Sequence, residues 1–521
     1  MIGGRRSLSG RKPGDRRVRV ERPHSAYFRY TGPNQFVAKA AASVPTDGVG
    51  RFVAGVKRVL IGRPLASEAE ITERVPKTKA LAIFSSDAIS SSTYASEEIL
   101  FILVAAGAAG IAFSVPIAIG IGLLLLIVST SYRQICYAYP SGGGAYAVAK
   151  ANVSQTSALF AAAALLFDYM MTVAVSTAAG VAAITSVEPA LLPFKVELCL
   201  IALAILTVAN LRGLRESGNI FALPTYAFVF GAIALIAAGA VAIATGDPRA
   251  AFAAPAIPEP PIGFEAIGPI LVIRAFAFGS VALTGTEAIS NGVPAFKPPE
   301  SRNAATTLTA MAILLGVIFV GISVLAAAYG IVPRENETVI SQVARGVFGG
   351  GIPYLAFQAA PALILVLAAN TGFNGAPRLG QILAIDGYLP RQFSFRGDRL
   401  AYSWGILILS AVAGVFIVAF EGSVSGLIPM YSVGIFASFT LSQAGMVRHW
   451  LGERIGAWRL KLGEDLPKEP PPPSRFASAL PIPTDTPRIA IINAIQNLFI
   501  DPPEDKRASR IRCKHSSDAG F

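Results

Sequence analysis

The chain has very few of the residues that form disulfide frameworks or catalytic sites. It contains only three cysteines and three histidines in 521 residues. Cys136, Cys199 and Cys513 are too scattered for a disulfide framework or a cysteine-based metal site. The histidines lie near or in the tails, so a Ser/His/Asp catalytic set inside the hydrophobic segments is excluded. We therefore expect no enzyme activity and no cofactor.

Charged residues are also scarce. They make up 15% of the chain, against about 25% in soluble domains, while hydrophobic residues make up 53%. Apolar runs of about 20 residues recur, each long enough to cross a hydrocarbon core of about 30 Å. The formal net charge is +12, but the basic residues sit mainly in the tails and in one set of loops. That is the positive-inside pattern, so we expect an all-α polytopic protein with a lipid bilayer as its partner and no nucleic acid.

Both ends of the chain differ from its hydrophobic middle. Residues 1–50 hold ten Lys and Arg against three acids and lack a signal-peptide core, which predicts a disordered basic cytosolic arm. Residues 51–78 predict an amphipathic cytosolic lead-in, with a short basic helix on the inner membrane surface. Residues 79–447 are expected to form the transmembrane core. Residues 448–521 are rich in proline and predict a cytosolic tail.

The core is expected to contain ten transmembrane helices. Their approximate ranges are 79–106, 113–132, 155–186, 196–211, 219–244, 266–296, 305–331, 353–376, 403–420 and 424–446. With the N-terminus inside, ten Lys and Arg fall in cytoplasmic loops and four in outer loops. This balance predicts a multi-pass protein of the inner (plasma) membrane with both termini in the cytoplasm.

A polar stretch, Ser85–Tyr94, interrupts the first segment. It contains Asp87, and an ionisable group at membrane depth costs about 2.5–3.5 kcal/mol even on a lenient insertion scale, so a functional role is expected. Residues 287–291, Glu-Ala-Ile-Ser-Asn, echo residues 87–91, Asp-Ala-Ile-Ser-Ser. The two stretches open two sets of five segments. An odd number of spans reverses orientation, which predicts a 5+5 inverted repeat with broken helices 1 and 6.

Further oxygen-bearing side chains share helical faces with these acids. Asp168, Thr172 and Ser176 are spaced i, i+4, i+8 in the third segment. Oxygen ligands of this kind suit a hard cation, although any single hydroxyl can instead bond to its own helix backbone. A fixed carboxylate in the break would repel a substrate carboxylate, so a cationic substrate is favoured. Arg274, in the sixth segment, could alternatively pair with Glu287 and hold it in a structural role.

Five motifs together resemble a known superfamily. They are Phe84-Ser-Ser-Asp-Ala-Ile-Ser, Tyr139-Pro-Ser-Gly-Gly-Gly-Ala-Tyr, Asn210-Leu-Arg-Gly, Leu283-Thr-Gly-Thr-Glu-Ala-Ile-Ser-Asn-Gly and Gly397-Asp-Arg-Leu. The Gly-rich motif lacks the Gly-Lys-Ser/Thr of a phosphate loop, so a tight turn is expected there. From about Arg51 to Trp450 the chain resembles the amino acid–polyamine–organocation superfamily, and within it the KimA-type potassium transporters related to the KUP group.

The resemblance implies a LeuT-type fold and potassium uptake coupled to protons. It also implies cation-binding residues and a proton-coupling residue, Glu287. The implied cation-binding residues are Asp87, Tyr94, Asp168, Tyr169, Thr172, Ser176, Thr284 and Tyr431. Among them, the implied direct K⁺ ligands are Asp87, Asp168, Thr172 and Ser176.

The resemblance also carries a departure from the family pattern. Family members continue with two more membrane helices and a cytosolic domain that contributes to dimerisation and nucleotide regulation, and the proline-rich tail stands in their place here. We therefore expect the C-terminal part of the pattern, and the family's route to a homodimer, to be missing. Two alternatives stay open: a permease for cationic amino acids or polyamines, and a truncated paralogue that does not transport.

Overall fold

The computed structural model describes most of the hydrophobic middle of the chain. The described residues are 7–9, 16–18, 28–32, 35–38, 55, 74–212, 218–246, 266–334, 336–395 and 402–452. The amphipathic helix expected within residues 51–78 lies outside them, except for Gly55 and residues 74–78. The Pro-rich tail lies outside them from residue 453 onward.

Two short hairpins stand in the N-terminal part, where a disordered arm was expected. Strand β1 (Ser7–Ser9) pairs antiparallel with β2 (Arg16–Val18), and β3 (Phe28–Gly32) pairs antiparallel with β4 (Gln35–Ala38). The second hairpin has a local reason, since aromatic and β-branched residues favour strands. Both hairpins precede residues 79–447, where the expected helices are found.

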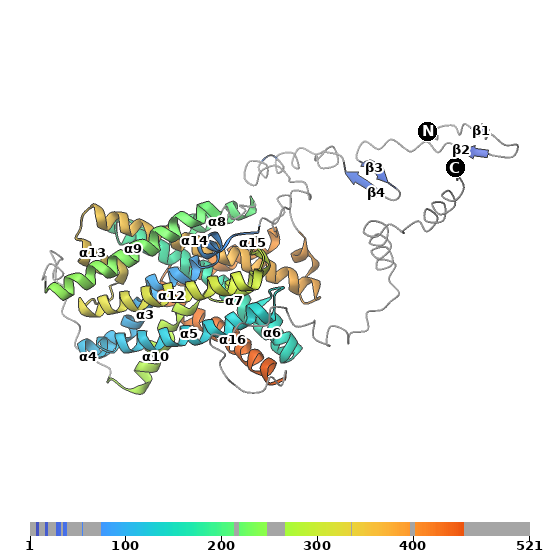
Figure 1. The fold of residues 1–521 in the computed structure, drawn as a ribbon. Coiled ribbons are helices and arrows are strands. Elements are labelled where there is room, and N and C mark those ends of the chain that lie inside the picture. Colours follow the sequence, from blue (N-terminus) through green and yellow to red (C-terminus); the bar gives the residue numbers. More distant parts are fainter. Residues whose placement is uncertain are drawn as a thin grey trace, which may run out of the picture. The chain divides into compact units, whose positions relative to one another are not determined.

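The other regular elements among the described residues are helices (Figure 1). The first set is α2 (Lys77–Phe84), α3 (Ser86–Leu103), η3 (Val104–Ala106), α4 (Gly107–Ile111), α5 (Ser114–Ala138), α6 (Gly144–Asn152), α7 (Gln155–Thr185), η4 (Pro189–Phe194), α8 (Lys195–Leu211) and α9 (Gly218–Thr245). The second set is α10 (Pro269–Gly279), η5 (Ser280–Leu283), α11 (Ala288–Asn291), η6 (Val293–Ala295), α12 (Glu300–Ala328), α13 (Val339–Phe348), α14 (Ile352–Ile385), η7 (Arg391–Ser394), α15 (Ser403–Ala419) and α16 (Val424–Gly452).

Nine helical segments of the described residues are long and apolar enough to cross a membrane. They coincide with nine of the ten expected segments. The tenth, expected at 403–420, is helix α15, which has 17 residues and is shorter than the other nine. Large apolar side chains point outward from the bundle, for example Ile127 (67% exposed), Phe230 (68%) and Val433 (69%). An apolar outer surface on helices of this length is the signature of a polytopic membrane protein.

Both expected helix breaks are present, and the first is shorter than predicted. Ser85 alone separates α2 from α3. Residues 86–94 are helical, and Ser90, Ser92 and Thr93 satisfy their buried hydroxyls by donating hydrogen bonds to carbonyls three residues earlier on the same helix. The second break spans residues 284–287, between η5 and α11, and contains Gly285 at φ +74°.

Helices at corresponding places in the two halves of the chain pack on each other. Helix α3 contacts α10, α5 contacts α12, α7 contacts α14, and α8 contacts α15. The α3–α10 contact brings the two breaks together, and Ser91 Oγ donates a hydrogen bond of 3.0 Å to the Ala282 carbonyl. A short helix, α6 or α13, follows the second long helix in each half.

The Gly-rich motif forms the tight turn expected of it. Gly142, Gly143 and Gly144 have φ values of +77°, +107° and +49°, and α6 begins at Gly144. A Cβ on Gly144 would lie 1.8 Å from Asn291 Oδ1, so glycine is required for the turn to pack against α11.

Candidate cation-binding site

All nine residues assigned to the cation and proton site are buried in the middle of the bundle. They come from α3, from α7, from the break before α11 and from α16. Their exposed fractions are Asp87 2%, Tyr94 3%, Asp168 4%, Tyr169 4%, Thr172 1%, Ser176 1%, Thr284 1%, Glu287 2% and Tyr431 0%.

The two breaks meet at Asp87. A Cβ built on Gly285 would lie 2.8 Å from Asp87 Oδ2 and 2.7 Å from the backbone nitrogen of Ala88. The positive φ of Gly285 lets the chain turn here, and its missing side chain lets the break approach α3. The echoing acidic motifs are therefore adjacent in space as well as alike in sequence.

Helix α7 presents its polar face to α16 and α14. Thr172 Oγ1 and the Tyr431 hydroxyl are 2.9 Å apart, which links α7 to α16. A Cβ on Gly434 of α16 would lie 3.4 Å from the Asp168 nitrogen, and one on Gly372 of α14 would lie 2.7 Å from the Tyr169 carbonyl. Glycines on both neighbours thus allow close packing around the residues that carry the site.

Tyr169 connects α7 to the far end of the second break. Asn291 Nδ2 donates a hydrogen bond of 3.0 Å to the Tyr169 hydroxyl. Because Asn291 also packs against the Gly142–Gly144 turn, the turn, α7 and α11 are held together around this contact. Tyr169, which the resemblance places at the cation site, thus also takes part in a hydrogen bond between helices.

The site contains an unusual number of polar atoms without partners. In the described part of the chain, buried side-chain oxygens of four of the nine residues have no hydrogen-bond partner. These atoms are Asp87 Oδ1, Asp168 Oδ1, Ser176 Oγ and Glu287 Oε2. Buried polar groups are nearly always hydrogen-bonded, so these atoms are candidates for contact with a bound ion or water. All four are oxygens, which is the ligand type that a hard cation prefers.

Three acidic side chains lie together at this place. Asp87, Asp168 and Glu287 lie close enough for their charges to interact. Arg274 projects from an exposed position on α10, whereas Glu287 is 2% exposed. Among the described residues, no three His, Cys, Asp or Glu side chains are grouped closely enough to hold a metal ion together. A cation in this site would therefore be bound by carboxylates and hydroxyls in combination.

The sequence reasoning missed several residues. Ser438 and Gln443 of α16 add further buried polar atoms without partners in the described residues. Tyr132 of α5 lies within hydrogen-bond reach of Ser442 of α16. No local pattern marks this pair, because it forms only where α5 packs against α16. Glu98, which follows Tyr94 by four residues on α3, was also missed, and a longer search along the helical stripe of Asp87 could have found it.

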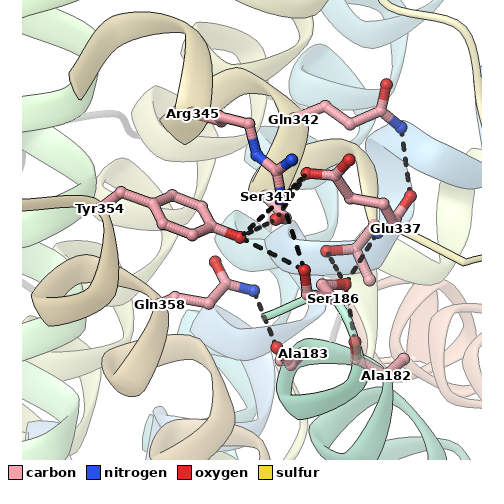
Figure 2. Close-up of polar contacts among 10 residues, drawn as sticks. Ala182, Ala183, Ser186, Glu337, Ser341, Gln342, Arg345, Tyr354 and Gln358 are labelled. Carbon is pink, nitrogen blue, oxygen red and sulfur yellow. Dashed lines mark hydrogen bonds and ion pairs between the residues drawn. The ribbon is translucent and has the colours of Figure 1, made fainter. Parts of the chain in front are cut away.

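A polar network joins the end of α7, helix α13 and the start of α14, as Figure 2 shows. Arg345 forms an ion pair of 3.0 Å with Glu337, and Tyr354 and Ser341 hydroxyls are 2.8 Å apart. Burial acts to lower the pKa of Arg345, but the hydrogen bond with Tyr354 and the charge of Glu337 outweigh it, so the pKa is raised. The network holds α13 in place through a permanent positive charge.

A second network links α6 to Asp386, the residue that directly follows α14. Lys150 Nζ donates a hydrogen bond of 2.6 Å to Asp386 Oδ2, and Tyr146 donates to the same oxygen. Burial acts to raise the pKa of Asp386, but the hydrogen bonds from Lys150 and Tyr146 and the Lys150 charge outweigh it, so the pKa is lowered. The hydrogen bond to Asp386 raises the pKa of Lys150 against the opposing effect of burial.

Comparison with known proteins identifies a family for this helical bundle. Residues 78–500 match the family model described as "Amino acid permease". The potassium transporter KimA of Bacillus subtilis (strain 168) is 48% identical over 403 residues, which cover 77% of this chain and 66% of that relative. The chain thus matches just under two thirds of the length of the relative. The family match covers more than half of the chain and agrees with the all-helical, apolar core, so this multi-pass membrane protein belongs to the amino acid permease family.

Proposed function

We propose that the protein takes up potassium together with protons, by alternating access of a central site to the two sides of the membrane. The observation that carries the proposal is the cluster of buried carboxylate and hydroxyl oxygens without partners. A similar protein whose name says potassium transporter, 48% identical, supports the choice of cargo. Potassium and protons would be the substrates, and no resident cofactor is needed for this cycle.

The architecture that we propose is the LeuT-type 5+5 inverted repeat. Four pairs of helices at equivalent places in the two halves contact each other, as helices near a two-fold pseudo-symmetry axis would. The breaks occur in the first long segment of each half, and α6 and α13 occupy equivalent places between the second and third long helices. Helix α15 would complete the count of ten spans despite its 17 residues, since a short span is tolerated by local thinning of the bilayer.

In this proposal Asp87, Asp168, Thr172 and Ser176 are the direct potassium ligands. Tyr94, Tyr169, Thr284 and Tyr431 line the site and replace part of the water shell of the ion. The Thr172–Tyr431 contact would hold the cation ligands of α7 at a fixed distance from α16.

Glu287 is proposed as the proton-coupling group. Burying several carboxylates together is costly unless positive charge accompanies them. A proton on Glu287 and a cation beside Asp87 would together bring the site near neutrality. Without either the proton or the cation, the change from the outward-facing to the inward-facing state would be less favourable. The movements of the proton and the cation would therefore be coupled.

A permease for cationic amino acids or polyamines is the alternative carrier function. The close approach of Gly285 to Asp87 leaves little room for a large organic cation beside that acid. Counterflow with radiolabelled arginine and spermidine separates this alternative, because a potassium carrier should show neither exchange.

We further propose that both termini lie in the cytoplasm of an inner (plasma) membrane protein. The exposed residues Lys297 and Asn336 would then lie on opposite sides of the membrane. In intact cells, an impermeant thiol reagent should label an Asn336→Cys variant and leave Lys297→Cys unlabelled. The reverse labelling would overturn the orientation.

The central test uses the purified full chain in proteoliposomes. Rubidium-86 uptake should increase when an inward proton gradient is imposed, and Asp87→Asn should reduce it by at least about tenfold while the protein remains folded. Gel-filtration and thermal unfolding profiles control for folding. Wild-type protein that moves no rubidium, or an Asp87→Asn variant with wild-type flux, would contradict the proposal and favour the non-transporting paralogue or another ligand set.

A further inference from the structure

A third acidic residue continues the polar stripe of α3 beyond the central site. Asp87, Tyr94 and Glu98 are separated by seven and four residues, so they lie on one face of the helix. At 1.5 Å per residue, Glu98 lies about 16 Å along the helix from Asp87. All three side chains are buried, with exposed fractions of 2%, 3% and 0%. The stripe runs from the first break toward the end of α3, which is the outer end in the proposed orientation.

One carboxylate oxygen of Glu98 has a partner and the other does not. Ser425, at the start of α16, donates a hydrogen bond of 2.7 Å to Glu98 Oε1. Glu98 Oε2 has no hydrogen-bond partner in the described part of the chain. A proton on Oε2 would leave an O–H group that likewise lacks an acceptor there. A cation, by contrast, could contact both carboxylate oxygens and the Ser425 hydroxyl oxygen at once.

The neighbouring acid has a different environment. Glu97 Oε2 accepts a hydrogen bond of 3.1 Å from the backbone nitrogen of Val339, the first residue of α13. Glu97 also lies close enough to Lys195 for the two charges to interact. The N-terminus of α13 and the positive charge of Lys195 therefore offset the negative charge of Glu97. Among the described residues, Glu98 has neither kind of neighbour, although it is the more deeply buried of the two.

We propose that Glu98 and Ser425 form a second cation site, which an alkali cation occupies between the outer solution and the central site. The inference rests on the proposed potassium transport. Glu98 is 0% exposed and α13 packs on α3 close to it, so the proposed site is closed to solvent in this structure. Glu98 would bind the incoming ion as it sheds its water, before Asp87 receives it.

The test measures rubidium-86 uptake in intact cells over a range of external concentrations. Glu98→Gln keeps an acceptor for Ser425 and removes only the charge, so we expect the KM for rubidium to rise about tenfold with little change in the maximal rate. Glu97→Gln is the matched control and should leave the KM unchanged. Glu98→Asp, which retains the charge, should lie closer to wild type than Glu98→Gln.

Two further measurements keep the outcomes distinct. Ser425→Ala removes the proposed hydroxyl ligand and should also raise the KM for rubidium. This variant tests the second site if the Glu98→Gln protein does not accumulate in the membrane. Equilibrium binding of rubidium-86 to purified protein should show weaker or fewer sites in Glu98→Gln. A wild-type KM in both Glu98→Gln and Ser425→Ala would overturn the second site. Absence of rubidium flux in the wild type would instead overturn the proposed function.

Discussion

Gly285 packs directly against the Asp87 carboxylate. A Cβ at position 285 would lie 2.8 Å from Asp87 Oδ2, and the residue sits at φ +74°. At the second helix break, Gly285 therefore has two roles. It allows a positive φ, and its missing side chain leaves space for the Asp87 carboxylate. The contact ties the conformation of the break directly to the acid expected to bind the cation.

Substituting Gly285 should therefore disturb the site more than it disturbs the fold. The matched control is Gly349, which has the same φ of +74° and no atom within 4 Å of an added Cβ. Both Gly285→Ala and Gly349→Ala should cost about 1–3 kcal/mol of stability, because each places alanine at a positive φ that favours glycine. Only Gly285→Ala should also displace Asp87 and abolish rubidium uptake. Uptake by Gly285→Ala equal to that of Gly349→Ala would show that the Asp87 contact has no role.

The Thr172–Tyr431 contact should couple α7 to α16 energetically. Thr172→Val and Tyr431→Phe each remove one hydroxyl from a buried pair 2.9 Å apart. Each single variant should lose about 1–3 kcal/mol of stability because the remaining hydroxyl is left buried without a partner, and the double variant should lose less than the sum. Thermal unfolding of the purified proteins measures the coupling. Strict additivity would mean that the two hydroxyls do not interact.

Glu287→Gln should separate cation movement from proton movement. The amide keeps the shape of a protonated carboxyl but cannot exchange a proton. Residual rubidium flux in proteoliposomes should lose its response to an imposed pH gradient, and the internal pH, followed with a fluorescent dye, should stay constant. Glu97→Gln provides a control at another acid of the same transmembrane region. A Glu287→Gln protein that still moves protons with rubidium would rule out the coupling role, and pairing with Arg274 would then become the better explanation.

The Lys150–Asp386 pair should make a small, pH-dependent contribution to stability. The lowered pKa of Asp386 means that its contribution is present above the unfolded pKa of about 4 and is lost as the pH falls through the folded value. The raised pKa of Lys150 means that its contribution is lost at the alkaline end, as the pH rises through the folded value.

The expected size is small because both side chains are partly exposed, 41% for Lys150 and 26% for Asp386. Asp386→Asn should cost no more than about 1 kcal/mol at pH 7, and the difference from wild type should vanish at strongly acidic pH. Thermal unfolding of both proteins across this range is the measurement. A difference that persists unchanged in acid would show that the pair acts through packing rather than charge.

Several features follow from the amino-acid sequence alone. The length of the apolar runs, the stripe of Asp168, Thr172 and Ser176, and the turn at Gly142–Gly144 all appear in the structure as expected, and the interruption expected over Ser85–Tyr94 is reduced to a break at Ser85. Each of these features depends either on neighbouring residues within a few helical turns or on the match between segment length and bilayer thickness. A single sequence contains the information for both.

The tertiary structure decided which oxygens are free. Ser90 and Ser176 are both buried serines on transmembrane helices, yet Ser90 bonds to its own backbone and Ser176 has no partner in the described residues. Glu97 and Glu98 are adjacent, and only one of them meets the N-terminus of α13. Sequence spacing places a side chain on a face of its helix, but the helix that covers that face comes from a distant part of the chain. Whether a buried oxygen is satisfied or remains available to an ion is therefore settled only when the helices pack.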